Sequence, residues 1–307
     1  MVITVTGSTG TIGAELVRLL SQRRLPTRAL LRDTTRLRAL PNVAWVQTDV
    51  RDADLLEPAL AGTTRLFLLS SNEPGFGMTQ IQVVKAAQRF NIEHVVKLSA
   101  LGASAHSNSA IAREHWGVEQ ALQQSGVGWI ILRPHAFMQN WIGEVAESVR
   151  SEGVIYSPIG DGRVPFIDAR DIAAVALEAL VNPEAHGGRK YVLTGGEAVG
   201  YADLALALSK VTGRTVTYQP ISMDEARSRM QAKGVSPEMI EAMLAIAAYQ
   251  KAGGPTATIS DKVERILGRP PRNIRDFVRY YAGYFTTAVP SNDAGQPTGS
   301  VGDTATR

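Results

Sequence analysis

The sequence predicts an α/β protein built around a doubly wound, mostly parallel sheet, with a smaller C-terminal α/β lobe. In the first half, short apolar runs of strand length alternate with helical patterns. A turn rich in glycine joins the first of these strands to the first helix, and Gly and Pro interrupt the second half more often. Regular β–α alternation is typical of parallel sheets, and the more interrupted half is expected to form the smaller lobe.

The elements of the first half follow from apolar runs and the breaks between them. We expect strands at residues 2–5, 27–31, 44–47, 65–69, 94–99 and 128–132. We expect helices at residues 13–23, around 35–40, near 55–60, at 79–90 and at 110–125. Residues 1–150 are therefore expected to form one core domain.

The elements of the second half are shorter and more widely separated. Glycine-rich turns at 160–162 and 187–188 precede a strand at 191–194 and helices at 201–212, 236–251, 261–267 and 274–285. We assign residues 151–286 to a smaller lobe whose strands and helices return to the core. Residues 287–307 offer almost nothing to bury, so we expect a disordered tail.

Composition excludes several classes of function. The chain has 307 residues, 44% of them hydrophobic and 20% charged, as in ordinary soluble proteins. Its net charge of +3 is spread along the chain, which argues against nucleic acid as a partner. It has no Cys, so disulfides and thiolate chemistry are excluded. We find no signal peptide and no run of about 18 apolar residues, and expect a cytoplasmic protein without a membrane partner.

Two further chemistries lack the residues that they need. No His-x-x-x-His pair or carboxylate cluster has the spacing of metal ligands, and no Gly-x-Ser-x-Gly elbow is present. Asp168, Arg170 and Asp171 form a charged group, but they stand where a helix is expected to begin. We interpret them as structural, because acidic residues cap helices and favour the first turn.

A spaced-glycine motif follows the first strand. Gly7 permits a tight turn, Gly10 lets backbone approach a ligand, and Gly13 lets the helix pack on the sheet. The helix N-terminus adds free N–H groups and the positive end of its dipole. The motif therefore predicts a site for the pyrophosphate of a dinucleotide. The expected binding residues are Gly7, Thr9, Gly10, Thr11, Ile12 and Gly13.

The residues after the second strand indicate which dinucleotide binds. Arg32 follows the strand directly, and Arg36 and Arg38 come soon after it. Arginine at this place accommodates the 2′-phosphate of NADP, whereas an acidic residue binds the 2′-hydroxyl of NAD. Asp33 keeps NADH open as the cofactor, but the local basic character favours NADPH. The alternative interpretation is a solvated basic loop.

Two polar residues at strand ends are candidates for the adenosine side of the site. Asp49 follows the third strand and is expected to accept a hydrogen bond from the adenine amine, or else to cap the next helix. Ser70 ends the fourth strand, where backbone is expected to pass the adenosine.

Several motifs together resemble the atypical short-chain dehydrogenases. They are the glycine motif, Arg32-Asp33, Ser99 at the end of the fifth strand and Leu132-Arg133-Pro134 at the end of the sixth. The phrases at 164–173 and 268–277 are similar to the NmrA-like group, which includes quinone oxidoreductases, triphenylmethane reductases and nitrogen-regulator homologues. The resemblance implies a Rossmann fold with an NAD(P)-binding core and a substrate lobe.

The resemblance also shows what this chain lacks. Typical short-chain dehydrogenases place a Tyr general acid four residues before a Lys. With Glu119 as the family's marker, these two positions hold Ile111 and His115. This departure argues against ordinary ketone reduction and sugar epimerisation. Quinones, azo dyes and similar acceptors remain, because they take hydride with little help.

Ser99, His115 and His135 are the candidates for the reacting centre. We expect His115 to bond a ribose hydroxyl or substrate oxygen and to relay a proton near pH 7, or else to pack on its helix. His135 follows Pro134 at a strand end, where the active sites of open α/β sheets lie. Ser99 and Pro134 are both expected to border the cofactor.

A group of aromatic and Met side chains is expected to hold the substrate. Such side chains suit a flat, apolar ligand, and Asn140 would add a polar tip. The alternative is that Phe137 and Trp141, four residues apart, pack into the core. The candidate substrate residues are Phe76, His135, Phe137, Met138, Asn140 and Trp141.

These observations predict an NADPH-dependent reductase that transfers hydride to a quinone-like or polycyclic aromatic acceptor, in a secondary-metabolite tailoring step for example. One alternative is a protein that tailors or couples aromatic polyketides without redox chemistry. Another is a redox-sensing regulator that binds NAD(P) without turnover, with the helix at 236–251 as an apolar patch for its partner or as a lid. The resemblance also allows a homodimer.

Overall fold

The computed structural model describes residues 1–35, 39–73 and 75–286, so the predicted tail at 287–307 lies outside the described residues. The described part contains a seven-stranded sheet in the order β3-β2-β1-β4-β5-β6-β8, and every neighbouring pair is parallel. Its strands are β1 (Ile3–Val5), β2 (Thr27–Leu31), β3 (Val43–Gln47), β4 (Arg65–Leu68), β5 (His94–Leu98), β6 (Gly128–Pro134) and β8 (Arg189–Leu193). The order reverses between β1 and β4, which confirms the predicted doubly wound fold.

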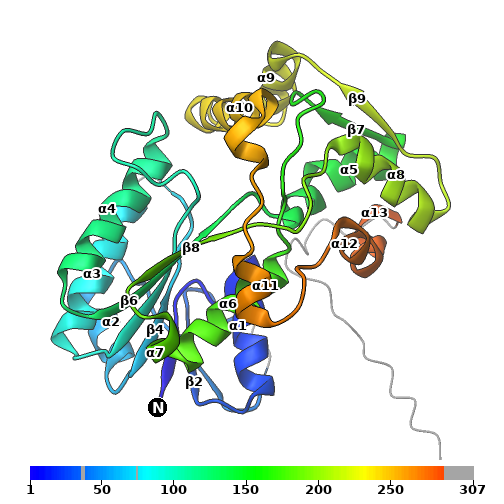
Figure 1. The fold of residues 1–307 in the computed structure, drawn as a ribbon. Coiled ribbons are helices and arrows are strands. Elements are labelled where there is room, and N and C mark those ends of the chain that lie inside the picture. Colours follow the sequence, from blue (N-terminus) through cyan, green and yellow to red (C-terminus); the bar gives the residue numbers. More distant parts are fainter. Residues whose placement is uncertain (36–38, 74, 287–307) are drawn as a thin grey trace, which may run out of the picture.

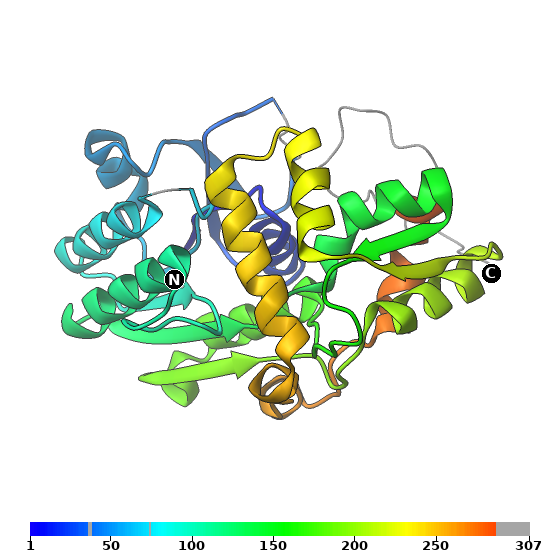
Figure 2. The same ribbon diagram turned by 90° about the horizontal axis from the view of Figure 1, so that it is seen from above.

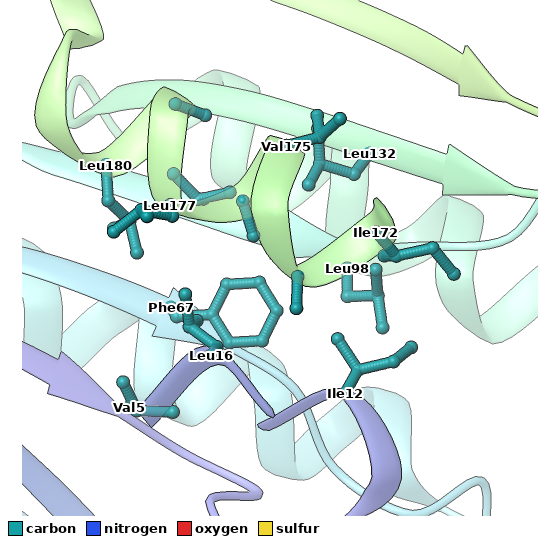
Figure 3. Packing of buried hydrophobic residues seen from close by; sticks show 14 of the residues in the cluster. Val5, Ile12, Leu16, Phe67, Leu98, Leu132, Ile172, Val175, Leu177 and Leu180 are labelled. Atoms are coloured by element: carbon teal, nitrogen blue, oxygen red, sulfur yellow. The ribbon is translucent and has the colours of Figure 1, made fainter. Parts of the chain in front are cut away.

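Helices cover both faces of this sheet (Figure 1). One face packs against α2 (Ala53–Leu60), α3 (Phe76–Arg89) and α4 (Ala110–Gln124). The other packs against α1 (Thr11–Gln22), α6 (Ala169–Val181) and α11 (Lys262–Leu267). Figure 3 shows this second packing, with Leu16 of α1 beside Phe67 of β4, both fully buried. Because both faces are covered, the strands are apolar runs, and this is why they could be predicted.

A second lobe lies beside the sheet and has its own core. Its elements are η1 (Met138–Ile142), α5 (Glu144–Glu152), β7 (Val154–Ser157), α8 (Tyr201–Thr212), β9 (Thr217–Pro220), α12 (Ile274–Tyr280) and α13 (Ala282–Thr286). β7 and β9 pair in parallel as a small sheet. The chain passes between the two lobes several times, since α6, α7 (Pro183–His186), β8 and α11 lie with the large sheet.

Two further helices lie above the rest of the molecule in Figure 1 and cross its middle in the view from above in Figure 2. α9 (Met223–Ala232) packs against α10 (Pro237–Ala252) through a small cluster that includes Met230, Ile240 and Leu244. The short η2 (Gly254–Ala257) then leads from α10 down to α11. In the described part of the chain, no helix is long and apolar enough to span a membrane.

Buried carboxylates at the start of α6 join the lobes. Asp168 is the N-cap of α6, and its Oδ1 accepts a hydrogen bond from Gln139 Nε2 at 2.9 Å. Asp171 is fully buried and accepts hydrogen bonds from Arg269 Nη2 and the backbone N–H of Arg272, both at 2.6 Å. These contacts confirm the structural interpretation of the charged group at the helix start.

Several predicted elements differ from the structure. Thr35 lies in a turn and residues 39–40 are not helical, while 36–38 lie outside the described residues. α3 begins three residues earlier than predicted, because Gly75, with φ of 82°, ends the preceding turn as its N-cap. The helix expected at 274–285 is divided into α12 and α13. β7, β9, α5 and α9 were not predicted.

Candidate functional site

The glycine turn lies at the carboxyl end of β1, where the strand order reverses. Gly7 has a φ of 61°, and a Cβ there would lie 2.9 Å from the carbonyl oxygen of Leu69. A Cβ on Gly13 would lie 2.1 Å from the carbonyl oxygen of Gly7, so only glycine lets α1 approach the turn this closely. The motif therefore lies at the switch point where open α/β sheets bind their ligands.

The N-terminus of α1 presents backbone rather than side chains. Gly10 is the N-cap, forms no side-chain cap, and donates its N–H to the carbonyl oxygen of Gly7 at 3.1 Å. Thr9, Gly10 and Thr11 are exposed. Ile12 is buried in the sheet core, so only its backbone is available to a ligand. An exposed helix N-terminus without a capping side chain is a fitting place for a phosphate.

Arg32 extends into solvent at the end of β2. Its side chain is 59% exposed, and the guanidinium lies 4.0 Å from the carboxylate of Glu73, an exposed partner. Asp33 turns back on the chain, because its Oδ1 accepts a hydrogen bond from the N–H of Thr35 at 2.9 Å. Of Arg32 and Asp33, Arg32 is therefore the one whose side chain is placed to bind an anionic ligand. The other predicted arginines, Arg36 and Arg38, lie outside the described residues.

The two candidates for the adenosine side already have partners. Asp49 forms an ion pair with Arg51, in which Oδ2 of Asp49 lies 2.5 Å from Nη2 of Arg51. Hydrogen bonds from Arg51 lower the pKa of Asp49 to about 2. The alternative that Asp49 caps the next helix is wrong, because Asp52 is the N-cap of α2. The hydroxyl of Ser70 accepts a hydrogen bond from Gln80 Nε2 at 2.7 Å.

A buried carboxylate organises the carboxyl ends of β5 and β6. Glu119, on α4, is fully buried and accepts hydrogen bonds from Arg133 Nη2 at 2.6 Å, Lys190 Nζ at 3.0 Å and Ser99 Oγ at 2.5 Å. Burial raises the pKa of Glu119, but the hydrogen bonds from Arg133, Ser99 and Lys190 outweigh it, so this pKa is lowered. Ser99 therefore donates its hydroxyl proton to the protein itself.

Beside this carboxylate, a buried lysine faces the predicted His115. Lys97, on β5, is fully buried, and its Nζ lies 3.1 Å from Nδ1 of His115 on α4. Burial lowers the pKa of Lys97 to about 7, although Glu119 opposes the shift. Burial and the charge of Lys97 lower the pKa of His115 to about 2. A ring that stays neutral near pH 7 does not fit the expected proton relay, and the expected hydrogen bond to a ribose hydroxyl or substrate oxygen stays a prediction.

The residues that follow β6 differ in their access to a ligand. Pro134 and His135 are buried, and Nδ1 of His135 accepts a hydrogen bond from the N–H of Ala136 at 2.7 Å. Phe137 is half-buried against the sheet core, and Asn140 is exposed. Of these predicted substrate residues, Phe137 and Asn140 have side-chain surface that a ligand can reach.

Three predicted substrate residues are packed inside the protein. Trp141 is 1% exposed. The centroid of its ring lies 4.7 Å from the ring centroid of Phe166 and 5.4 Å from that of Phe277. Met138 is buried in the same core. A substrate role for these two side chains does not fit their positions, and the core alternative for Trp141 is correct. Phe76 is the buried first residue of α3, and its ring lies 4.8 Å from that of His115.

Two buried residues that make contacts described above, Lys97 and Gln139, were not among the predicted site residues. Lys97 is a charged residue inside an apolar strand, and that placement alone was a usable signal. Gln139 bonds Asp168 and also the N–H of Ala169, at 2.8 Å, yet nothing in the sequence distinguishes it from Asn140. Among the residues that the structure describes, no group of three or more acidic or histidine side chains could hold a metal ion.

Comparison with known proteins agrees with this architecture. A model of the NmrA-like family matches residues 1–277. The chain is 36% identical over 289 residues to the NAD(P)H azoreductase of Xenophilus azovorans, spanning 93% of this chain and 100% of that protein. It is 35% identical over 285 residues, 92% of this chain and 99% of that protein, to the (4-alkanoyl-5-oxo-2,5-dihydrofuran-3-yl)methyl phosphate reductase of Streptomyces griseus.

A solved structure shows the same likeness in three dimensions. The crystal structure of the NADPH-dependent quinone oxidoreductase of Escherichia coli, complexed with NADPH, matches with a TM-score of 0.79 at 27% identity. The match covers 91% of this chain and 99% of that one. With the matched family model and relatives aligned along nearly their whole length, the chain belongs to the NmrA-like family.

Proposed function

We propose that the protein is an NAD(P)H-dependent reductase that transfers hydride from NADPH to a flat, electron-poor acceptor of the quinone or azo class. The glycine turn at the switch point carries this proposal, in a chain that aligns over 93% of its length with an NAD(P)H azoreductase. The NADPH complex of a quinone oxidoreductase with the same fold supports it.

The residues of the site fit NADPH. The turn from Gly7 to Gly13 and the N-terminus of α1 would hold the pyrophosphate, because they offer backbone N–H groups and no side chain caps the helix. Arg32 would bind the 2′-phosphate, and Asp49 and Ser70 would border the adenosine. Ser99 and Pro134, at the ends of neighbouring strands, would border the nicotinamide. When bound, the dinucleotide supplies a hydride.

The side chains favour an acceptor that needs little catalytic help. By the resemblance to short-chain dehydrogenases, Ile111 would stand where they have tyrosine, and its side chain cannot donate a proton. Ser99 has one hydroxyl proton, which is donated to Glu119, so Ser99 is not a free general acid. A quinone or azo compound spreads the incoming charge over its own π system and takes its proton from water.

The exposed side chains of α10 favour a flat, apolar acceptor. α10 crosses the middle of the molecule in the view from above (Figure 2), and its exposed large side chains include Met239, Met243, Ile246 and Tyr249. Met and aromatic side chains adapt to flat ligands. We propose that residues 1–150 bind the dinucleotide and that α10 and the 151–286 region, with Phe137 and Asn140, contain the acceptor site.

The test is an acceptor panel followed by NADPH absorbance at 340 nm. The panel contains a naphthoquinone, an azo dye and a phosphorylated butenolide, each also offered with NADH. We expect turnover with the quinone or the azo dye and preference for NADPH. Tight NADPH binding without turnover of any acceptor would contradict the proposal and would favour the redox-sensing alternative.

A further inference from the structure

We propose that Lys97 is a positioning residue that holds His115 as the neutral tautomer with its proton on Nε2, and that this pair replaces the absent tyrosine–lysine pair. The tautomer follows from contacts of the described residues at a pH where Lys97 is protonated. The role of the pair in catalysis rests on the proposed function, and the two parts can be tested separately.

The two side chains meet in the protein interior. Lys97 comes from β5 and His115 from α4, and their Nζ and Nδ1 atoms lie 3.1 Å apart. A second hydrogen bond, to the carbonyl oxygen of Leu98, fixes the ammonium group of Lys97. Lys97 is fully buried and His115 is 5% exposed, so water does not compete for this contact.

Hydrogen-bond chemistry determines which ring nitrogen carries the proton. Below its pKa of about 7, Lys97 is an ammonium group with three protons and no lone pair, so it can only donate. Nδ1 of His115 must then accept, and a neutral imidazole that accepts at Nδ1 has its proton on Nε2. A doubly protonated ring would place a second positive charge beside the ammonium group. The lowered pKa of His115 agrees with this exclusion.

Neighbouring residues hold the imidazole in place. The ring centroid of Phe76 lies 4.8 Å from the ring centroid of His115. The N-terminus of α3 is tied to α4, because the N–H of Gly77 donates to Glu114 Oε2 at 2.7 Å. His115 thus has little freedom to turn, and Nε2–H is the one donor that it can offer to a ligand.

The chemistry of this donor differs from that of tyrosine. The pKa of His115 is too low for the ring to become an imidazolium near neutral pH. We therefore assign it a hydrogen bond to the oxygen or nitrogen that gains negative charge when hydride arrives, while water delivers the proton. Such a donor, fixed in a dry site, stabilises developing charge without rearranging.

Nuclear magnetic resonance tests the tautomer without any activity. The full-length protein is labelled with ¹⁵N at its five histidines, and His115→Gln assigns the signal in long-range ¹H–¹⁵N spectra at pH 6. We expect a single Nε2–H tautomer in the unchanged protein and a mixture of tautomers in Lys97→Met. An Nδ1–H tautomer would overturn the assignment, and no change in Lys97→Met would overturn the positioning role of Lys97.

A matched control and a folding check accompany this experiment. His186 is also buried, and its Nδ1 lies 2.9 Å from the hydroxyl of Tyr191, with no lysine at that nitrogen. The His186 signal should be the same in Lys97→Met and in the unchanged protein. Met fills a volume similar to that of Lys, so we expect Lys97→Met to fold. If it does not, the spectrum of the unchanged protein still decides the tautomer.

Kinetics test the catalytic role. In His115→Phe, which keeps a ring against Phe76, we expect kcat with a quinone to fall at least about tenfold while the Kd for NADPH changes less than about threefold. Lys97→Met should show a smaller fall in kcat. An unchanged kcat in His115→Phe would overturn the role of the pair. Absence of turnover in the unchanged protein with both a quinone and an azo dye would instead contradict the proposed function and leave the tautomer result standing.

Discussion

The Cβ position of Gly13 lies 2.1 Å from the carbonyl oxygen of Gly7, closer than two such atoms can approach. The atom in the way belongs to the backbone, so Gly13→Ala must push α1 away from the turn. We expect the Kd for NADPH to rise at least about tenfold, with a loss of about 1–3 kcal/mol in unfolding free energy. Titration by protein fluorescence and urea unfolding measure the two effects.

Gly117 offers the matched control for this change. It lies within α4, and a Cβ there would meet nothing within 4 Å. Gly117→Ala should therefore leave the Kd for NADPH unchanged and raise the unfolding free energy by about 0.5–1 kcal/mol. Equal losses of affinity in both variants would contradict the role given to the glycine turn.

Arg32 is predicted to decide between the two dinucleotides. Arg32→Ala removes the cation proposed for the 2′-phosphate, so we expect KM for NADPH to rise at least about tenfold and KM for NADH to stay the same. Arg89 is the control, since its side chain is also 59% exposed and it pairs with Glu57 on the α2–α3 side. An equal rise in KM for both dinucleotides would show that Arg32 does not bind the 2′-phosphate.

Asp171 is predicted to stabilise the fold rather than to act in catalysis. Asp171→Ala leaves the guanidinium groups of Arg269 and Arg272 without their buried partner, so we expect a loss of about 3 kcal/mol in unfolding free energy. Urea unfolding measures it. Glu241, which pairs with Arg227 on the surface, is the control, and Glu241→Ala should have a much smaller effect.

The neutral state of His115 predicts a dependence of stability on pH. Its pKa is about 2 in the folded protein and near 6.5 in the unfolded chain, which therefore binds the additional proton between these values. Stability from this group is complete above pH 6.5 and falls as the pH decreases, by about 2 kcal/mol at pH 5. His115→Phe should lose less stability between pH 7.5 and pH 5.

Thermal unfolding at the two pH values measures this difference. Burial also lowers the pKa of His186, and this residue remains in the variant, so part of the acid sensitivity should persist. An equal loss of stability in the variant and the unchanged protein would show that His115 is protonated in the folded state.

The parts of the fold that could be predicted are those encoded locally. β1, the glycine turn and α1 follow one another within residues 3–22, and the turn needs glycine for reasons that act within that segment. The central strands are covered on both faces and therefore read as apolar runs. By contrast, β7 and β9 form a small sheet with several exposed positions, and their pattern is weak.

The parts of the site that could not be predicted depend on contacts between distant residues. Lys97 and His115 are 18 residues apart, and Asp171 and Arg272 are 101 residues apart. Trp141 looked available to a ligand because its partners, Phe166 and Phe277, come from other elements of the second lobe. Only the folded structure shows that these side chains are already bonded to, or packed against, other residues of the protein.

Hydride transfer from NADPH is tested most directly by the stoichiometry of NADPH oxidation with 1,4-naphthoquinone in the absence of oxygen. NADPH is followed at 340 nm, and the hydroquinone is quantified by chromatography. We expect one hydroquinone for each NADPH consumed, at a rate proportional to the protein and much reduced in Gly13→Ala. Bound NADPH that persists unoxidised beside excess quinone and, in a second reaction, beside excess azo dye would contradict hydride transfer to this class of acceptor.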